Sequence, residues 1–195
     1  MLHPSGTDGS PISCLRWRPV WSGQFIKPSS VLTSISSNGW IQHWHLATNK
    51  MMNEITDHIG EKNNLYAADY LRDGKKYAVG GLDRKIYVYD SSTKDLVCTM
   101  HGAGLKVPGH INRIYCIKAH PEDKNLLVSS GWDGMLKIYD IRDKNPVASM
   151  GGSLVSGDSL DIYDDMIVAG SYRAKDVMQI YSFSQRKKVH NFEFN

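Results

Sequence analysis

The chain has 195 residues, of which 41% are hydrophobic and 22% are charged, and its formal net charge is +3. This composition is that of a globular protein with enough apolar residues to build a core. A net charge this small does not by itself indicate binding to nucleic acid or to a membrane surface. No apolar run approaches the roughly 18 residues that cross a bilayer. We therefore expect a soluble protein with no membrane partner.

The cysteines and the start of the chain bear on its compartment. Cys14, Cys98 and Cys116 are widely spaced and form no CxxC pair, so they support neither a zinc site nor a disulfide framework. The opening MLHPSGTDGSPISC has neither the charged nor the apolar region of a signal peptide. These features predict reduced, buried thiols in a cytoplasmic protein, with a nuclear location left open.

Taken in chain order, four segments share one layout: residues 11–58, 60–101, 109–150 and 157–195. Within each segment, apolar and polar residues alternate over short runs separated by turn residues, as in RIYCIKA, NLLVSS and MLKIYDI of the third segment. Alternation of this kind is typical of β-strands, and no part of the chain sustains the apolar spacing of a helix. The sequence therefore predicts an all-β protein built from four repeated units.

The length of the repeat narrows the architecture. Each unit ends its third predicted strand on an aromatic residue, and successive aromatics are 45, 50 and 42 residues apart: Trp44, Tyr89, Tyr139 and Tyr181. A period of about 40 to 45 residues with four short strands is the size of a propeller blade. We expect four-stranded antiparallel blades.

The third unit carries the motif residues. Gly109-His110 precedes its first strand, Asp133 lies in the turn between strands two and three, and Tyr139-Asp140 closes the third strand. With these residues the chain resembles the WD-repeat β-propeller family, in which a Trp-Asp pair occupies the place of Tyr139-Asp140. The resemblance covers essentially the whole chain, although the fourth unit departs from it, with Arg173 at the turn position.

The resemblance implies a buried chain of hydrogen bonds in each blade. In the family, the turn acid accepts from the His before strand one, the His reaches a Ser in strand two, and the Ser meets the Trp indole. Here the matching residues are Asp133, His110, Ser129 and Tyr139. A phenol cannot place its donor where an indole does, so we expect the first three residues to bond and all four to be structural rather than catalytic.

The other units depart from this set. The first keeps Ser34 and Trp44 but lacks the His, while the second has Val79 and Glu61 at the Ser and His positions. We expect the bonded chain of the second unit to be absent or rebuilt.

The number of blades raises a further expectation. The family most often closes with seven blades, which needs roughly 300 residues at about 42 each. The four units predict either part of a seven-bladed propeller or a short protein whose open sheet edges pair with another chain.

The resemblance also implies a partner-binding mouth. In the family, the residue before the turn acid and the fifth residue after the His commonly face it. The matching residues are Trp132 and Tyr115 in the third unit, Tyr66 in the second and Tyr172 in the fourth, with Arg113 two residues before Tyr115. Aromatic and Arg side chains gathered on one surface are typical of interface hot spots. The alternative is that these rings only cover the blade tops.

A second candidate for docking is the loop of the first unit. Residues 20–30 read VWSGQFIKPSS, with Trp21 and Phe25 in a connection expected to be polar. These two rings are predicted either to dock a neighbouring protein or to fold back onto the blade.

The chain lacks the common catalytic motifs, including G-x-S-x-G, the phosphate-binding P-loop and H-E-x-x-H. We expect no cofactor, no metal site and no small-molecule substrate. The leading hypothesis is a non-catalytic scaffold with protein partners, a subunit of a larger assembly, which analogy with other members places in the cytoskeleton or cilium. The alternatives are an adaptor for chromatin or RNA, and an enzyme built on a propeller.

Overall fold

A computed structural model describes residues 11–21, 26–56, 63–102 and 107–192 of the chain. Within these ranges the regular structure is β, apart from one 3-10 turn at Leu46–Thr48. The strands form four antiparallel four-stranded sheets, and in each sheet every strand pairs with the next one along the chain. The all-β class and the four repeated units predicted from the sequence are confirmed.

The sheets are named blades 1 to 4 in chain order. Blade 1 holds β1 (Ile12–Trp21), β2 (Ile26–Ser36), β3 (Ile41–His45) and β4 (Lys50–Ile55). Blade 2 holds β5 (Leu65–Tyr70), β6 (Lys76–Gly81), β7 (Ile86–Asp90) and β8 (Leu96–Met100). Blade 3 holds β9 (Ile114–Ala119), β10 (Leu126–Gly131), β11 (Met135–Asp140) and β12 (Pro146–Gly151). Blade 4 holds β13 (Leu160–Tyr163), β14 (Met166–Gly170), β15 (Met178–Ser182) and β16 (Lys187–Phe192).

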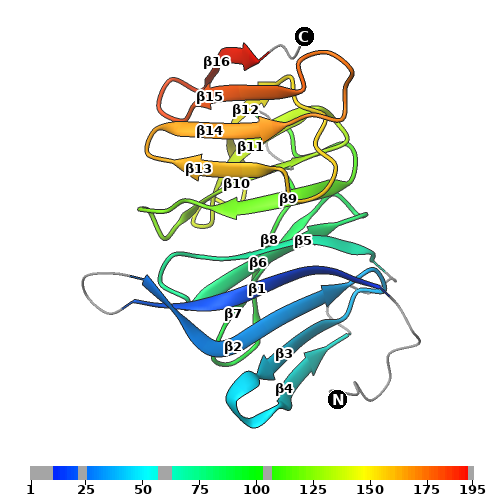
Figure 1. The fold of residues 1–195 in the computed structure, drawn as a ribbon, viewed down its shortest axis with the longest axis vertical. Helices are drawn as coiled ribbons and strands as arrows, with labels where there is room; N and C mark the ends of the chain where they lie inside the picture. The colour runs from blue at the N-terminus through cyan, green and yellow to red at the C-terminus, as the bar shows by residue number, and fades with distance from the viewer. Residues whose placement is uncertain (1–10, 22–25, 57–62, 103–106, 193–195) are drawn as a thin grey trace.

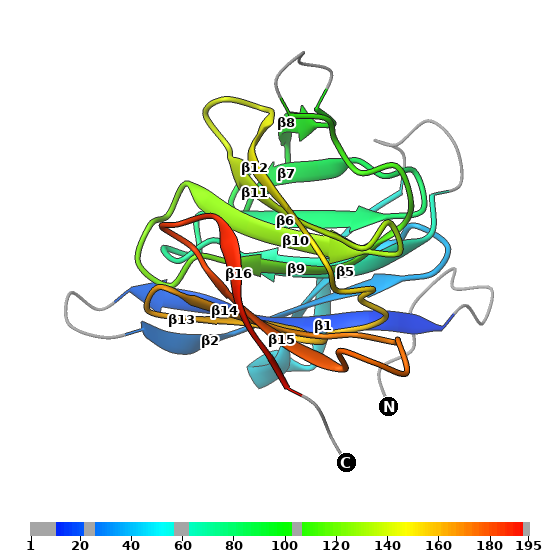
Figure 2. The ribbon, with the colours of Figure 1, turned by 90° about the horizontal axis from the view of Figure 1, so that it is seen from above.

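The first strand of each blade lies at the centre of the molecule. β5 packs against both β1 and β9, and β13 contacts β9. From this centre, blade 1 extends downward and blade 4 upward in Figure 1, with blades 2 and 3 behind them. Seen from above, blades 2 and 3 project to one side of β1 and β13 (Figure 2). The four sheets thus radiate from a common axis over part of a circle.

Alternation along each strand produces the core, which lies between neighbouring blades. In β10, Leu127 belongs to the cluster shared with blade 2, and the next residue, Val128, belongs to the cluster shared with blade 4. A third cluster joins Ile35, Ile41 and Ile55 of blade 1 to blade 2. Because successive side chains of a strand point to opposite faces, a sheet inside the array is apolar on both faces.

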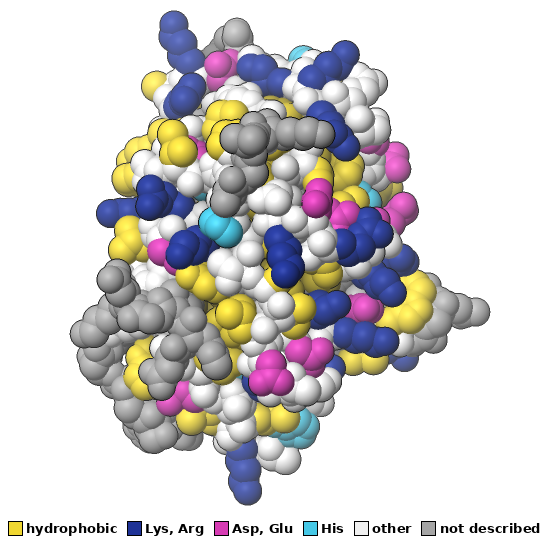
Figure 3. Space-filling view, turned by 180° about the vertical axis from the view of Figure 1, so that it is seen from behind, with side chains coloured by type: hydrophobic (Ala, Val, Ile, Leu, Met, Phe, Trp, Pro, Cys, Tyr) yellow, Lys and Arg dark blue, Asp and Glu magenta, His cyan; other side chains and the backbone are white. Residues whose placement is uncertain are grey.

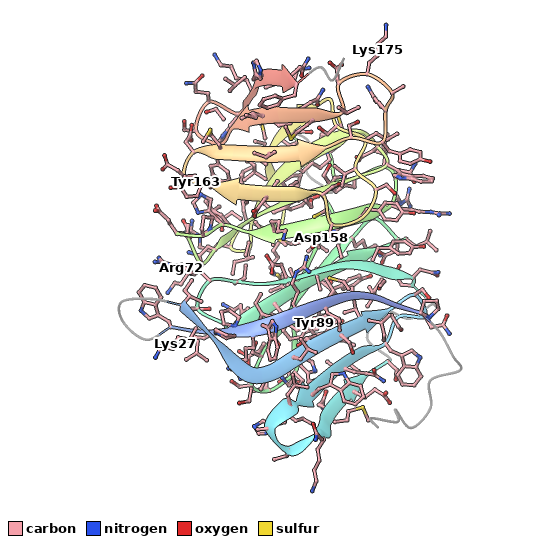
Figure 4. All side chains as sticks on the ribbon, in the orientation of Figure 1. Lys27, Arg72, Tyr89, Asp158, Tyr163 and Lys175 are labelled. Atoms are coloured by element: carbon pink, nitrogen blue, oxygen red, sulfur yellow. The ribbon has the colours of Figure 1, made fainter. Side chains whose placement is uncertain are left out.

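Ion pairs tie the central strands together. Arg16 of β1 lies 2.8 Å from Asp158, which precedes β13, and 3.5 Å from Asp69 of β5. Lys118 of β9 also approaches Asp158, at 3.5 Å. Figure 4 shows Asp158 at the centre of the molecule, between blades 1 and 4. This network links all four blades, and nothing in the repeat pattern predicted it.

A histidine is buried between blades 1 and 2. The side chain of His43 is fully buried and contacts the ring of Tyr77 edge-on, with ring centroids 5.2 Å apart. Neither ring nitrogen has a hydrogen-bond partner among the described residues. Burial, together with the positive charges of Lys94 and Arg18, lowers the pKa of His43 to about 3. The imidazole is therefore neutral in the folded protein.

This burial predicts a pH-dependent stability. Between pH 6.5 and about 3 the unfolded chain binds a proton at His43 that the folded protein does not, so the free energy of unfolding falls as the pH is lowered, by roughly 1.4 kcal/mol per pH unit. We expect His43→Leu to flatten this slope in urea titrations at pH 4 to 7. The control His101→Leu, at an exposed histidine, should keep it. Equal slopes for wild type and His43→Leu would contradict the prediction.

Candidate interaction site at the mouth of the propeller

The turns between the second and third strands of the blades lie at one end of the molecule, here called the mouth. In blade 3 this turn is held by buried hydrogen bonds. His110 Nδ1 lies 2.7 Å from Asp133 Oδ2, and His110 Nε2 lies 2.8 Å from Ser129 Oγ. Asp133 also accepts the backbone N–H groups of Ile111 and Met135, at 3.2 and 3.1 Å. One carboxylate thereby joins the segment before β9 to the turn before β11.

Electrostatics keep Asp133 charged. Burial alone would raise the pKa of this carboxyl, but the hydrogen bond and charge of His110 and the two backbone N–H groups hold it below its ordinary value.

The hydroxyl of Tyr139 has no hydrogen-bond partner among the described residues, and its ring stacks 6.4 Å from that of His110. The bonded set in this blade therefore consists of His110, Ser129 and Asp133.

In blades 1 and 2, other residues form the buried hydrogen bonds. In blade 1 the indole N–H of Trp44 donates to Ser34 Oγ at 2.9 Å. In blade 2 the Tyr87 hydroxyl donates to Asp83 Oδ2 at 2.5 Å, and the Asp83 N–H donates to Asn63 Oδ1 at 3.1 Å. The bonds of blade 2 are thus rebuilt around Asp83, the turn acid of this unit, with Asn63 and Tyr87 as partners that the sequence pattern did not indicate. Glu61 lies outside the described residues.

Blade 4 shows what the missed residues share. There Ser153 donates to Gln179 Oε1 at 2.8 Å, and the Tyr181 hydroxyl donates to the same oxygen at 2.5 Å. Gln179 lies two residues before the aromatic that ends the third strand. The same position is polar in every blade: Gln42, Tyr87, Lys137 and Gln179. The recurrence of a polar residue at this position is the feature of the sequence from which these hydrogen bonds could have been predicted.

Above the bonded turn of blade 3, three aromatic side chains form a continuous row across blades 2 and 3. The rings of Tyr66 and Tyr115 stack with centroids 4.8 Å apart, and the rings of Tyr115 and Trp132 lie 5.4 Å apart. Arg113 Cζ is 5.9 Å from the Trp132 ring centroid, within the range of a cation–π contact. Trp132 remains 41% exposed. We call these four residues the aromatic row.

The turn places Trp132 on the row because Gly131 allows close approach of two backbones. A Cβ on Gly131 would lie 1.9 Å from the carbonyl oxygen of Arg113. That same carbonyl accepts the N–H of Trp132 at 3.1 Å. A side chain at residue 131 would push the turn away from β9, and with it Trp132 away from Tyr115.

The remaining predicted site residues lie apart from the row. Tyr172 is 79% exposed, and the structure shows no ring contact between it and the row. Trp21 lies at the opposite end of the molecule, where Arg72 Cζ sits 4.5 Å from its ring centroid. Phe25 lies outside the described residues. Of the predicted mouth residues, the structure therefore brings together Tyr66, Arg113, Tyr115 and Trp132.

Comparison with known proteins bears on the family. The family model described as "WD domain, G-beta repeat" matches residues 104–140. WD repeat-containing protein 1 of Rattus norvegicus is 32% identical over 77 residues, which are 40% of this chain and 12% of that protein. These matches support a WD-repeat family for this chain. Its four sheets of four antiparallel strands are consistent with WD-repeat blades.

Two further relatives have names that describe assemblies. The U5 small nuclear ribonucleoprotein 40 kDa protein of Homo sapiens is 30% identical over 81 residues, covering 42% of this chain and 20% of the relative. Ribosome biogenesis protein YTM1 of Candida albicans is 28% identical over 119 residues, covering 60% and 23%. The matches thus span a minor part of each relative's length.

The described residues also bear on metal sites and membrane spans. Across the described ranges, no three or more His, Cys, Asp or Glu side chains stand together in a way that could hold a metal ion. In the same ranges, no helix has the length and apolar character needed to cross a membrane.

The bonded turn predicts a stability effect. His110→Ala should lower the free energy of unfolding by about 2–3 kcal/mol, because it leaves the buried Asp133 and Ser129 groups without their partner. The measurement is urea unfolding at neutral pH. The control Ile111→Ala removes a neighbouring side chain that is 75% exposed and should change the value by less than about 0.5 kcal/mol. A similar small effect for both variants would show that the bonds do not stabilise the blade.

Proposed function

We propose that this WD-repeat chain is a non-catalytic scaffold for protein assembly and that the aromatic row is its partner-binding surface. The observation that carries the proposal is the continuity of the row, in which side chains from β5, β9 and the β10–β11 turn contact one another and remain partly exposed. Aromatic and Arg side chains supply most of the binding energy at protein interfaces. Because stacked rings lose little further freedom on binding, such a row is a preorganised surface.

We further propose that the four blades are part of a larger propeller, with seven blades as the expected number. The support is the exposure of apolar side chains on the two outermost blade faces. Leu15 and Trp17 of β1, on the face turned away from blade 2, are 52% and 51% exposed. Tyr163 and Met166, on the face of blade 4 turned away from blade 3, are 77% and 44% exposed.

The assembly itself stays a proposal. A cytoskeletal or ciliary role and a cytoplasmic location rest on analogy alone. A nuclear or ribosome-assembly role is the second candidate, favoured by relatives whose names place them in a U5 ribonucleoprotein and in ribosome biogenesis. The net charge of +3 gives no separate support for direct nucleic-acid binding, so in either setting we expect contacts to protein.

The partner site is tested by replacing its aromatic side chains with alanine. Trp132→Ala and Tyr115→Ala should each abolish co-purification of proteins retained by the wild-type chain, because each change interrupts the row, while the thermal midpoint shifts by only a few degrees. The control Val97→Ala truncates a side chain that is 47% exposed on β8, the outermost strand of blade 2, and should keep all partners. Retention of the same partners by both aromatic variants would exclude the mouth as the binding site.

Direct RNA binding is tested separately. We expect the wild-type chain to show no measurable affinity for single-stranded RNA at physiological salt, and any affinity at low salt to be weak and to fall steeply as salt is raised, since it would rest on phosphate contacts alone. The measurement is fluorescence anisotropy over a salt series. Tight binding that persists at physiological salt would favour the RNA-adaptor alternative.

A further inference from the structure

At the end of the molecule opposite the mouth, the end of β1 in blade 1 and the turns between the first and second strands of blades 2 and 3 line a pocket of about 1000 Å³. Arg18 and Trp21 come from blade 1, Arg72 and Lys75 from blade 2, and Lys124 from blade 3. Figure 4 shows Arg72 at this end, on the left side of the view. A smaller hollow of about 230 Å³ adjoins the pocket and shares Arg72 with it.

The pocket is lined by four Lys and Arg side chains and three acidic ones, and two of the acidic groups accept backbone hydrogen bonds in turns. Asp73 Oδ1 accepts the N–H of Lys75 at 3.0 Å, and Asp123 Oδ1 accepts the N–H of Asn125 at 2.8 Å. Among the described residues, no ion pair joins the four cations of the pocket to a carboxylate. In Figure 3, Lys and Arg side chains gather on the right-hand side of the molecule, where this end is seen from behind.

The two guanidinium groups are held in place by the protein itself. Arg72 Nη1 donates to the carbonyl oxygen of Glu122 at 2.7 Å, and its Cζ lies 4.5 Å from the Trp21 ring centroid. Arg72 Nε is buried and has no hydrogen-bond partner among the described residues. Arg18 Nε donates to the carbonyl oxygen of Gly74 at 3.0 Å. Each guanidinium therefore donates from one nitrogen to a backbone carbonyl and has further N–H donors for an anion.

The lining also indicates which anions fit. The carboxylates of Asp73, Glu122 and Asp123 lie in the same pocket wall, so a polyanion such as a nucleic-acid strand would meet repulsion along with attraction. A short peptide can place one or two acidic groups against the cations and turn the rest of its chain away. Trp21, 43% exposed, offers an apolar surface for a neighbouring side chain of that peptide.

We propose that this pocket, here called the basic pocket, binds an acidic segment of a partner protein. Lys75, Lys124, Arg18 and Arg72 hold its carboxylate or phosphorylated side chains, and Trp21 contacts an adjacent apolar residue. The basic pocket is separate from the aromatic row, so one chain can engage two partners at opposite ends. Carboxylate and phosphate groups share the chemistry that the basic pocket recognises, and the test below separates them.

The test measures anisotropy of three short fluorescein-labelled peptides that share a Gly/Ser background and one Leu. They carry a pair of glutamates, a pair of phosphoserines, or a pair of glutamines at the same positions. Wild-type protein should bind one or both acidic peptides at least about tenfold more tightly than the glutamine peptide, as charge-assisted bonds are lost in the latter. The acidic peptide that binds more tightly identifies the anion.

Two double variants locate the site. Lys75→Glu/Lys124→Glu changes two exposed pocket lysines whose side chains bond no other described residue, so folding should be kept. This double variant should bind the acidic peptide at least about tenfold more weakly than the wild type does. Lys85→Glu/Lys188→Glu changes the net charge by the same amount at exposed lysines outside the pocket. Its affinity for the acidic peptide should fall by less than about twofold.

Three results would overturn the proposal. One is equal weakening by the two double variants, which would mean attraction by overall charge. Another is the absence of any preference for the acidic peptides over the glutamine peptide. The last is tighter binding of a single-stranded oligonucleotide that Lys75→Glu/Lys124→Glu abolishes, which would assign the basic pocket to nucleic acid. Trp132→Ala should leave peptide binding unchanged, so failure of the mouth proposal and failure of this one are distinguishable.

Discussion

Packing of each blade against its neighbour is the interaction on which the rest of this structure depends. A four-stranded sheet of this size buries little by itself, and here the core consists of three apolar layers, each shared by two blades. Alternate residues of one strand enter different layers, as Leu127 and Val128 do. The period of two in the sequence therefore results from the packing of both faces of a sheet. The same constraint leaves apolar side chains exposed on the two outermost faces, against which the described residues place no further blade.

A recurring polar residue of the third strand is hydrogen-bonded in every blade. The residue two before the third-strand aromatic is polar in each blade, and its partners differ from blade to blade. Gln42 pairs with Glu54, Tyr87 with Asp83, Lys137 with Ser149 and Gln179 with Ser153. Since a buried polar group without a partner costs about 1–3 kcal/mol, each blade has to complete its own set of bonds. The family pattern is thus one of several solutions to a common requirement.

The two ends of the molecule have different chemical character. At the mouth, hydrogen bonds from Asp133 fix a turn that presents stacked rings and one arginine. At the opposite end, backbone carbonyls fix two guanidinium groups beside a tryptophan. An apolar or aromatic partner segment suits the first surface and an acidic one the second. Two surfaces of different character at opposite ends agree with the scaffold proposal.

Much of the fold followed from local pattern alone. Repeat length, alternation and the turn acid are properties of single segments, and they predicted the strands, the four sheets and the family. Parts of the mouth could also be predicted, because Tyr66 and Tyr115 occupy equivalent positions in adjacent units, and equivalent positions in stacked repeats lie side by side. Tyr172, from the fourth unit, did not join the row. That unit has Arg173 at the turn position and a longer hairpin, so its equivalence was incomplete.

By itself, the sequence determined which residues face the blade layers and which lie in turns, since both depend on near neighbours in the chain. Only the tertiary structure decided what those turns form together. Trp21 and Arg72 are 51 residues apart, and Arg16 and Asp158 are 142 apart, yet both pairs are in contact. Their approach depends on the rotation and offset between blades, which arise from how whole sheets pack. No pattern within one repeat carries that information, and the basic pocket and the central ion pairs therefore became visible only in the folded chain.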